Sequence, residues 1–84
     1  MKLRVFIFIR VKPGSEDSVI AEIKEKVGEH VLEASGEKVV HEITGVYDVV
    51  VYMEVESLDI LRRVMESVRE IGGVIDTHTA IVVK

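Results

Sequence analysis

The chain has 84 residues, 48% of them hydrophobic and 5% aromatic, with a formal net charge of −4. This length supports one small domain, and the negative charge without a basic cluster argues against direct binding to nucleic acid. Cysteine is absent, which excludes disulfide bonds, thiolate catalysis and cysteine-ligated zinc. No apolar run approaches the ~20 residues of a membrane span and no signal peptide is recognisable, so we expect a cytoplasmic protein. Asparagine and glutamine are also absent, which is typical of thermophilic proteins.

The first predicted element is a strand over residues 3–11. Its side chains alternate between two faces that are both suited to packing. One face is aliphatic and consists of Leu3, Val5, Ile7, Ile9 and Val11, whereas the other is aromatic with charged ends and consists of Arg4, Phe6, Phe8 and Arg10. Pro13 and Gly14 then end the strand.

A helix is predicted next, over residues 16–34. Ser15 is its expected N-cap, and acidic residues follow in the first turn, where they favour the helix dipole. Apolar residues recur at helical spacing, namely Val19, Ile23, Val27, Val31 and Ala34. Gly28 predicts a bend or split in this helix, and Gly36 predicts its end.

The second half of the chain predicts three more strands and one more helix. The strands cover residues 39–44, 48–55 and 74–83, and the first two are joined by a tight turn at Gly45. Ser57 is expected to cap the second helix, which Gly72 and Gly73 close. The buried stripe of this helix consists of Leu61, Val64, Met65, Val68 and Ile71.

The resulting order βαββαβ predicts an α+β fold, the ferredoxin-like sandwich. Right-handed crossovers and the most apolar strands at the centre give an antiparallel four-stranded sheet in the order 4-1-3-2, with both helices on one face. The other face, which carries Phe6 and Phe8, would then be an exposed apolar patch. Such patches usually mark association, so we expect a homodimer built by two facing sheets.

Three segments together resemble the effector-binding domain, or RAM domain, of the Lrp/AsnC transcription regulators. They are residues 11–15 (VKPGS), 43–51 (ITGVYDVVV) and 73–79 (GVIDTHT), and the resemblance covers nearly the whole of residues 1–84 as one domain. It implies dimers that assemble further, commonly into octamers, and a small effector, typically an amino acid, bound between dimers. The residues that it implies for ligand binding are Thr44, Gly45, Val46, Tyr47, Asp48, Thr77 and Thr79.

The chain also departs from the pattern of this family. The regulators carry an N-terminal helix-turn-helix, whereas here the first strand starts at Leu3, so we expect a stand-alone form that does not bind DNA itself and acts on related transcription regulators. The segment over residues 31–38 is longer than usual, and Val46 stands at a position that is often acidic or polar.

Simpler roles stay open for the same residues. Asp48 could merely close the turn, Tyr47 could merely pack, and threonines are common on edge strands. The three histidines, His30, His41 and His78, lie on separate predicted elements, so no metal site is expected, and no cofactor or catalytic constellation is expected either. The alternatives to an amino-acid-binding regulatory module are a small dimeric α/β-barrel enzyme of the monooxygenase type and an ACT-type amino-acid sensor.

Overall fold

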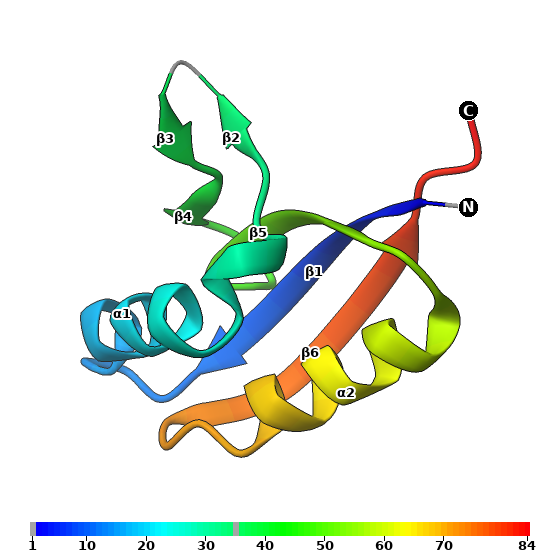
Figure 1. The fold of residues 1–84 in the computed structure, drawn as a ribbon. Helices are drawn as coiled ribbons and strands as arrows, with labels where there is room; N and C mark the ends of the chain where they lie inside the picture. The colour runs from blue at the N-terminus through cyan, green and yellow to red at the C-terminus, as the bar shows by residue number, and fades with distance from the viewer. Residues whose placement is uncertain (1, 35) are drawn as a thin grey trace.

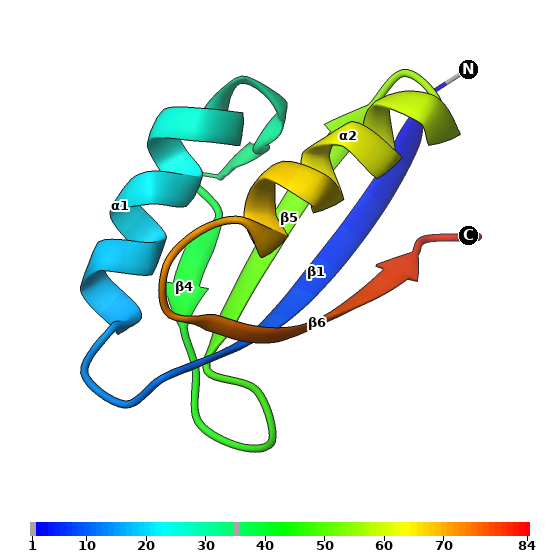
Figure 2. The same ribbon diagram turned by 90° about the horizontal axis from the view of Figure 1, so that it is seen from below.

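The computed structural model describes residues 2–34 and 36–84 and shows two helices packed on one face of a sheet (Figure 1). In chain order its elements are β1 (Leu3–Val11), α1 (Glu16–Val27), η1 (Gly28–His30), β2 (Glu33–Ala34), β3 (Glu37–Lys38), β4 (Val40–Glu42), β5 (Val49–Val55), α2 (Leu58–Arg69) and β6 (Val74–Ile81). Figure 2 shows both helices in front of the same sheet.

The main sheet is antiparallel, with the strand order β4-β5-β1-β6. Counting only its four strands along the chain, this is the predicted order 4-1-3-2 read from the opposite edge. The register pairs Ile7 with Val51 on one side and with Thr79 on the other. Side chains opposite one another in an antiparallel ladder point to the same face, so this register decides which residues share a face.

The core lies between the sheet and the helices and is entirely aliphatic. It contains no buried polar or charged side chain among the described residues. Its members come from every layer and are Val5, Ile7, Ile9, Val11, Val19, Ile23, Val27, Val31, Val40, Val49, Val51, Met53, Val55, Leu61, Val64, Met65, Val68 and Ile71. The predicted inward face of β1 and the predicted stripe of α2 are both confirmed by this set.

The two helices begin where the sequence predicts, but by different chemistry. The hydroxyl of Ser57 accepts a hydrogen bond from the N–H of Ile60 at 3.2 Å, so Ser57 caps α2 with its side chain. Ser15 is the N-cap residue of α1, yet its side chain makes no capping bond. Its backbone carbonyl instead accepts from the N–H of Val19 at 2.9 Å and from the hydroxyl of Ser18 at 3.0 Å.

The prediction that the first helix runs to residue 34 is wrong. The α-helix ends at Val27, and the single turn of η1 follows. Val31 then pairs with Met53 at the free side of β5, so it is buried by a strand-like bridge instead of a helical stripe. The α-helix therefore ends seven residues before its predicted end, and the chain joins the sheet edge at Val31, because this edge offers backbone hydrogen bonds that a longer helix would leave unmade.

Strands β2 and β3 form a small hairpin that projects from the edge of the main sheet (Figure 1). Gly36 has φ 82° in its turn, so this glycine serves the hairpin and does not end a helix as predicted. At the base of the hairpin, the N–H of Leu32 donates to Tyr52 O at 2.9 Å and the N–H of Val39 donates to Leu32 O at 2.8 Å. The segment over residues 31–38, predicted to be longer than usual, thus contains an anchored two-stranded hairpin.

Candidate functional site

The connection between β4 and β5 is a short exposed turn fixed at both ends by backbone bonds. The N–H of Ile43 donates to Asp48 O at 2.8 Å, and the N–H of Asp48 donates to Ile9 O at 2.9 Å. Gly45 has φ 133°, a conformation that side-chain-bearing residues rarely adopt. Thr44, Gly45 and Val46 are exposed, and Val46 keeps 77% of its surface in solvent.

The backbone of this turn offers hydrogen-bond donors. Among the bonds made within residues 2–34 and 36–84, none is donated by the N–H groups of residues 44–47. Backbone donors that are left unbonded at an exposed turn can bind an anion such as a carboxylate. The turn therefore has the chemistry for one end of an amino acid.

Asp48 takes part in holding the sheet together. Its Oδ2 accepts a hydrogen bond from the N–H of Val11 at 2.9 Å, just beyond the last pair of β1 with β5, Ile9 with Val49. Asp48 thus supplies a partner for a strand N–H that has passed the end of the neighbouring strand. Asp48 is half-buried, and its second carboxylate oxygen makes no bond to another described residue, so the turn-closing role and a ligand-binding role are compatible.

Tyr47 folds back from the turn onto the face of the sheet that the helices leave open. Its ring centroid lies 5.7 Å from that of Phe8 and 6.1 Å from that of His78. Tyr47 thus links the turn to β6. The contact with His78 is not predictable from local sequence, because the two residues meet only through the cross-strand register of β1 with β6.

Thr77 and Thr79 lie on the opposite face of the sheet from Tyr47. They pair with Ile9 and Ile7, which point into the core. The Thr79 hydroxyl lies 3.4 Å from the Met65 sulfur, and Arg69 Nε lies 3.4 Å from the Thr77 hydroxyl oxygen. Both hydroxyls share a face as predicted, but within one chain the structure does not bring them together with the turn of residues 44–48.

The open face carries every aromatic side chain of the protein. Phe6 and Tyr52 stack with ring centroids 4.5 Å apart, and Phe6 and Phe8 lie 6.4 Å apart. With Tyr47 these are the two phenylalanines and two tyrosines of the sequence, which has no tryptophan. We call Phe6, Phe8, Tyr47 and Tyr52 the aromatic face.

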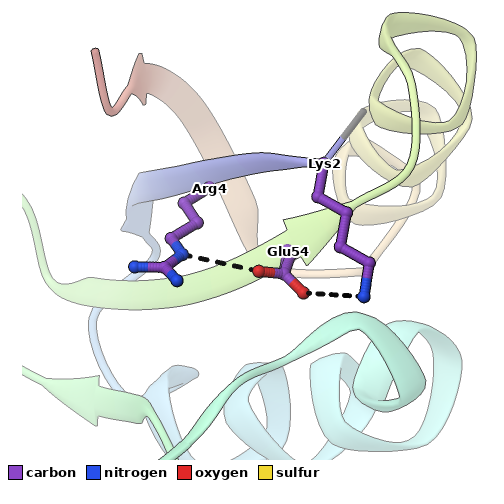
Figure 3. Close-up of polar contacts among 3 residues, drawn as sticks. All are labelled: Lys2, Arg4 and Glu54. Atoms are coloured by element: carbon purple, nitrogen blue, oxygen red, sulfur yellow. Dashed lines mark hydrogen bonds and ion pairs between the residues drawn. The ribbon is translucent and has the colours of Figure 1, made fainter. Parts of the chain in front are cut away.

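Charged pairs border the aromatic face at both ends. At one end Glu54 lies 3.4 Å from Arg4 and 3.7 Å from Lys2 (Figure 3). At the other end Arg10 lies 3.8 Å from Asp76. The pKa of Arg4 is raised above its ordinary value, first by the Tyr52 side chain and then by Glu54. An apolar centre with a charged rim is the usual anatomy of a protein interface.

Neither a metal cluster nor a membrane-spanning helix is present in the part of the chain that the structure describes. His30, His41 and His78 belong to separate elements, and no three potential metal ligands come together among residues 2–34 and 36–84. Within the same residues, no helix is long and apolar enough to cross a membrane.

The fold is shared with several solved structures. TTHA0845 from Thermus thermophilus matches with a TM-score of 0.81 and 23% identity, over 98% of this chain and 94% of that one. Escherichia coli AsnC has a TM-score of 0.81 and 24% identity over 98% of this chain, which spans only 51% of AsnC. A feast or famine regulatory protein from M. tuberculosis, complexed with L-methionine, has a TM-score of 0.72 and 20% identity, over 98% of this chain and 50% of that one.

No curated protein matches the chain. The family model of the Lrp/AsnC ligand binding domain, in contrast, matches residues 4–84. This match agrees with the βαββαβ order of the main elements and with the strand order of the sheet. The chain belongs to the Lrp/AsnC ligand-binding domain family, so it is a regulatory domain that binds small molecules.

Proposed function

We propose that this domain binds an amino acid at the turn of residues 44–48 and that binding controls its assembly with other subunits. The observation that carries the proposal is the pairing, at one exposed turn, of N–H groups without internal partners and the carboxylate of Asp48. The L-methionine complex of the M. tuberculosis protein, which has the same fold, supports an amino acid as the ligand class.

The two ends of an amino acid require opposite partners, and the turn offers both. The N–H groups around Gly45 would take the ligand carboxylate, and the unbonded oxygen of Asp48 would take its ammonium group. Charge-assisted bonds of this kind gain strength when water is excluded. Thr44, Val46 and Tyr47 would form the wall around the ligand, with Tyr47 held in place by its tilted ring contact with Phe8.

A second chain is needed to complete this pocket. Thr77 and Thr79 point to the helix side of the sheet, whereas Tyr47 points to the open side. Threonine hydroxyls from a neighbouring subunit would therefore meet the turn of residues 44–48, in an assembly of dimers as large as an octamer. In that arrangement the ligand contacts two dimers at once and stabilises the larger species by mass action.

The dimer itself would form through the aromatic face. Two such faces packed at about 10 Å would bury the exposed rings. Each end of the face already pairs cations with an acid, which lowers the charge repulsion between two identical faces. The partners of this homodimer would be related transcription regulators, and we propose neither catalysis nor direct binding of nucleic acid by the domain.

The test is binding of the twenty amino acids to wild type and to Asp48→Asn, by thermal shift and then calorimetry. The asparagine keeps an oxygen that accepts from the Val11 N–H, so the bond to β1 is kept while the charge is removed. We expect Asp48→Asn to weaken binding of the selected amino acid by about 2–5 kcal/mol, because one partner of a desolvated charge pair is lost.

Light scattering should show that the same variant keeps the wild-type dimer, because Asp48 does not belong to the aromatic face. Thr77→Val serves as a second variant, since it removes a hydroxyl with little change in shape. An Asp48→Asn protein that binds the amino acid as tightly as wild type does would refute this site.

A further inference from the structure

The early end of α1 creates a hollow that is separate from the turn of residues 44–48. Figure 2 shows α1 and α2 diverging toward the end at which α1 passes into η1. A cavity of about 300 Å³ lies there between the helices. It is lined by Lys26, Val27, Glu29, His30, Ile60, Arg63, Val64 and Ser67.

The floor of this hollow is aliphatic. Val27 and Val64 are buried members of the core, and Ile60 packs against that core while keeping part of its surface exposed. A volume of 300 Å³ is at the lower end of the range for small-molecule pockets. An apolar group of a few carbon atoms would therefore fit against this floor.

The rim of the hollow carries more positive than negative charge. Lys26 and Arg63 face one acid, Glu29, whose carboxylate lies 3.7 Å from the His30 ring. Lys26 makes a long contact of 3.8 Å with Glu22, and no ion pair formed within residues 2–34 and 36–84 includes Arg63. The Arg63 guanidinium thus has its donors available for a planar anion.

The carbonyl end of a helix normally repels anions, but here that repulsion is offset. The ammonium group of Lys38 in β3 donates a hydrogen bond to Gly28 O at 2.6 Å, and the N–H of Val31 donates to the same oxygen at 3.1 Å. A positive charge therefore lies on the carbonyl at which α1 ends. The β2–β3 hairpin, through Lys38, therefore makes this end of α1 more tolerant of an anion.

We propose that this hollow binds a small aliphatic monocarboxylate, with its hydrocarbon part on Val27, Ile60 and Val64 and its carboxylate on Arg63 and Lys26. Both features are needed for this assignment, because the floor selects an apolar group and the rim selects a negative one. The site is independent of the turn of residues 44–48 and of the aromatic face.

The probe is isovalerate, added to the ¹⁵N-labelled full chain and followed by amide chemical shifts. We expect saturable shifts at Val27, His30, Arg63 and Val64, with a dissociation constant on the order of 1 mM, because so small a ligand gains limited binding free energy. Arg63→Gln should weaken binding about tenfold or more, the usual effect of losing a charge-assisted bond.

The neighbouring Arg62→Gln is the matched control, because Arg62 pairs with Asp59 at 2.7 Å and does not line the hollow. It should bind isovalerate as wild type does, and so should Asp48→Asn, which separates this site from the turn. Equal binding of the neutral isovaleramide or of inorganic phosphate would overturn the proposal, since either would show that one of the two features is not used. Shifts confined to residues 44–48, or no shifts at all, would overturn it as well.

Discussion

Gly73 is a single residue on which the close packing of two segments depends, because no side chain fits at its position. It precedes β6 with φ 99°, and its carbonyl accepts a bond from the N–H of Lys12 at 2.8 Å. A Cβ at this position would lie 2.8 Å from the Cβ of Ser15 and 3.3 Å from Val19 Cγ2. Gly73 therefore allows the start of β6 to approach the start of α1.

Gly73→Ala should lower the free energy of unfolding by about 2–4 kcal/mol, since it adds overpacking to the cost of a left-handed backbone. Gly14→Ala is the control: Gly14 has φ 88°, but its added Cβ would meet nothing within 4 Å. It should cost only about 1–2 kcal/mol. Urea unfolding at one fixed protein concentration measures both, and equal losses would contradict the packing argument.

At the same scale, the sequence could name the residues of the candidate site but not their orientation. Turn chemistry picks out Gly45 and Asp48, because a tight turn needs such residues. The bond from the Val11 N–H to Asp48 depends on where the pairing of β1 with β5 ends, which no local pattern encodes. The opposite facing of Tyr47 and Thr77 likewise follows from strand pairing between distant segments.

Among the elements, the four strands of the main sheet and the second helix are predictable because their patterns are unambiguous. Alternation in β1 and the stripe from Leu61 to Val68 each match one period only. The predicted first helix is too long because Val31 continues the helical spacing of apolar residues. In the structure Val31 pairs with Met53 instead. Local periodicity cannot distinguish these two modes of burial, so the β2–β3 hairpin was missed.

Lys38 links the β2–β3 hairpin to the end of α1 through its hydrogen bond to Gly28 O. We expect this bond to contribute measurably to the free energy of unfolding. The Lys38 side chain runs close to Gly28, since a Cβ added to Gly28 would lie 3.7 Å from the Lys38 Cε. Lys38→Met keeps a side chain of similar length there but removes the ammonium group. It should lower the free energy of unfolding by about 1–2 kcal/mol, because the bond to Gly28 O is charge-assisted and only part-buried.

Lys24→Met is the control for that change. Lys24 is an exposed lysine of α1 that makes no hydrogen bond or ion pair within residues 2–34 and 36–84. Its replacement should leave the free energy of unfolding within about 0.5 kcal/mol of wild type. If Lys38→Met and Lys24→Met changed the free energy of unfolding equally little, the bond from Lys38 to Gly28 O would not contribute to stability.

At the scale of the whole molecule, aliphatic and aromatic side chains are divided between two surfaces of one sheet. The buried core of the described residues uses only Val, Ile, Leu and Met, although aromatic rings would bury more area per residue. All four rings lie instead on the face that the helices leave uncovered. That division favours the aromatic face as a surface for association.

Phe6→Glu should therefore convert the proposed dimer to a monomer. Phe6 retains 37% exposure and stacks on both Phe8 and Tyr52, so it lies at the centre of the face. Two-fold symmetry would bury two unpaired carboxylates per dimer, which should weaken association by about 3 kcal/mol or more.

Leu58→Glu is the control, since Leu58 is 60% exposed at the start of α2, away from this face, where an acid favours the helix. Light scattering at micromolar concentration should give a dimeric mass for wild type and Leu58→Glu and a monomeric mass for Phe6→Glu. A monomeric wild type, or a dimeric Phe6→Glu, would show that the aromatic face is not the interface.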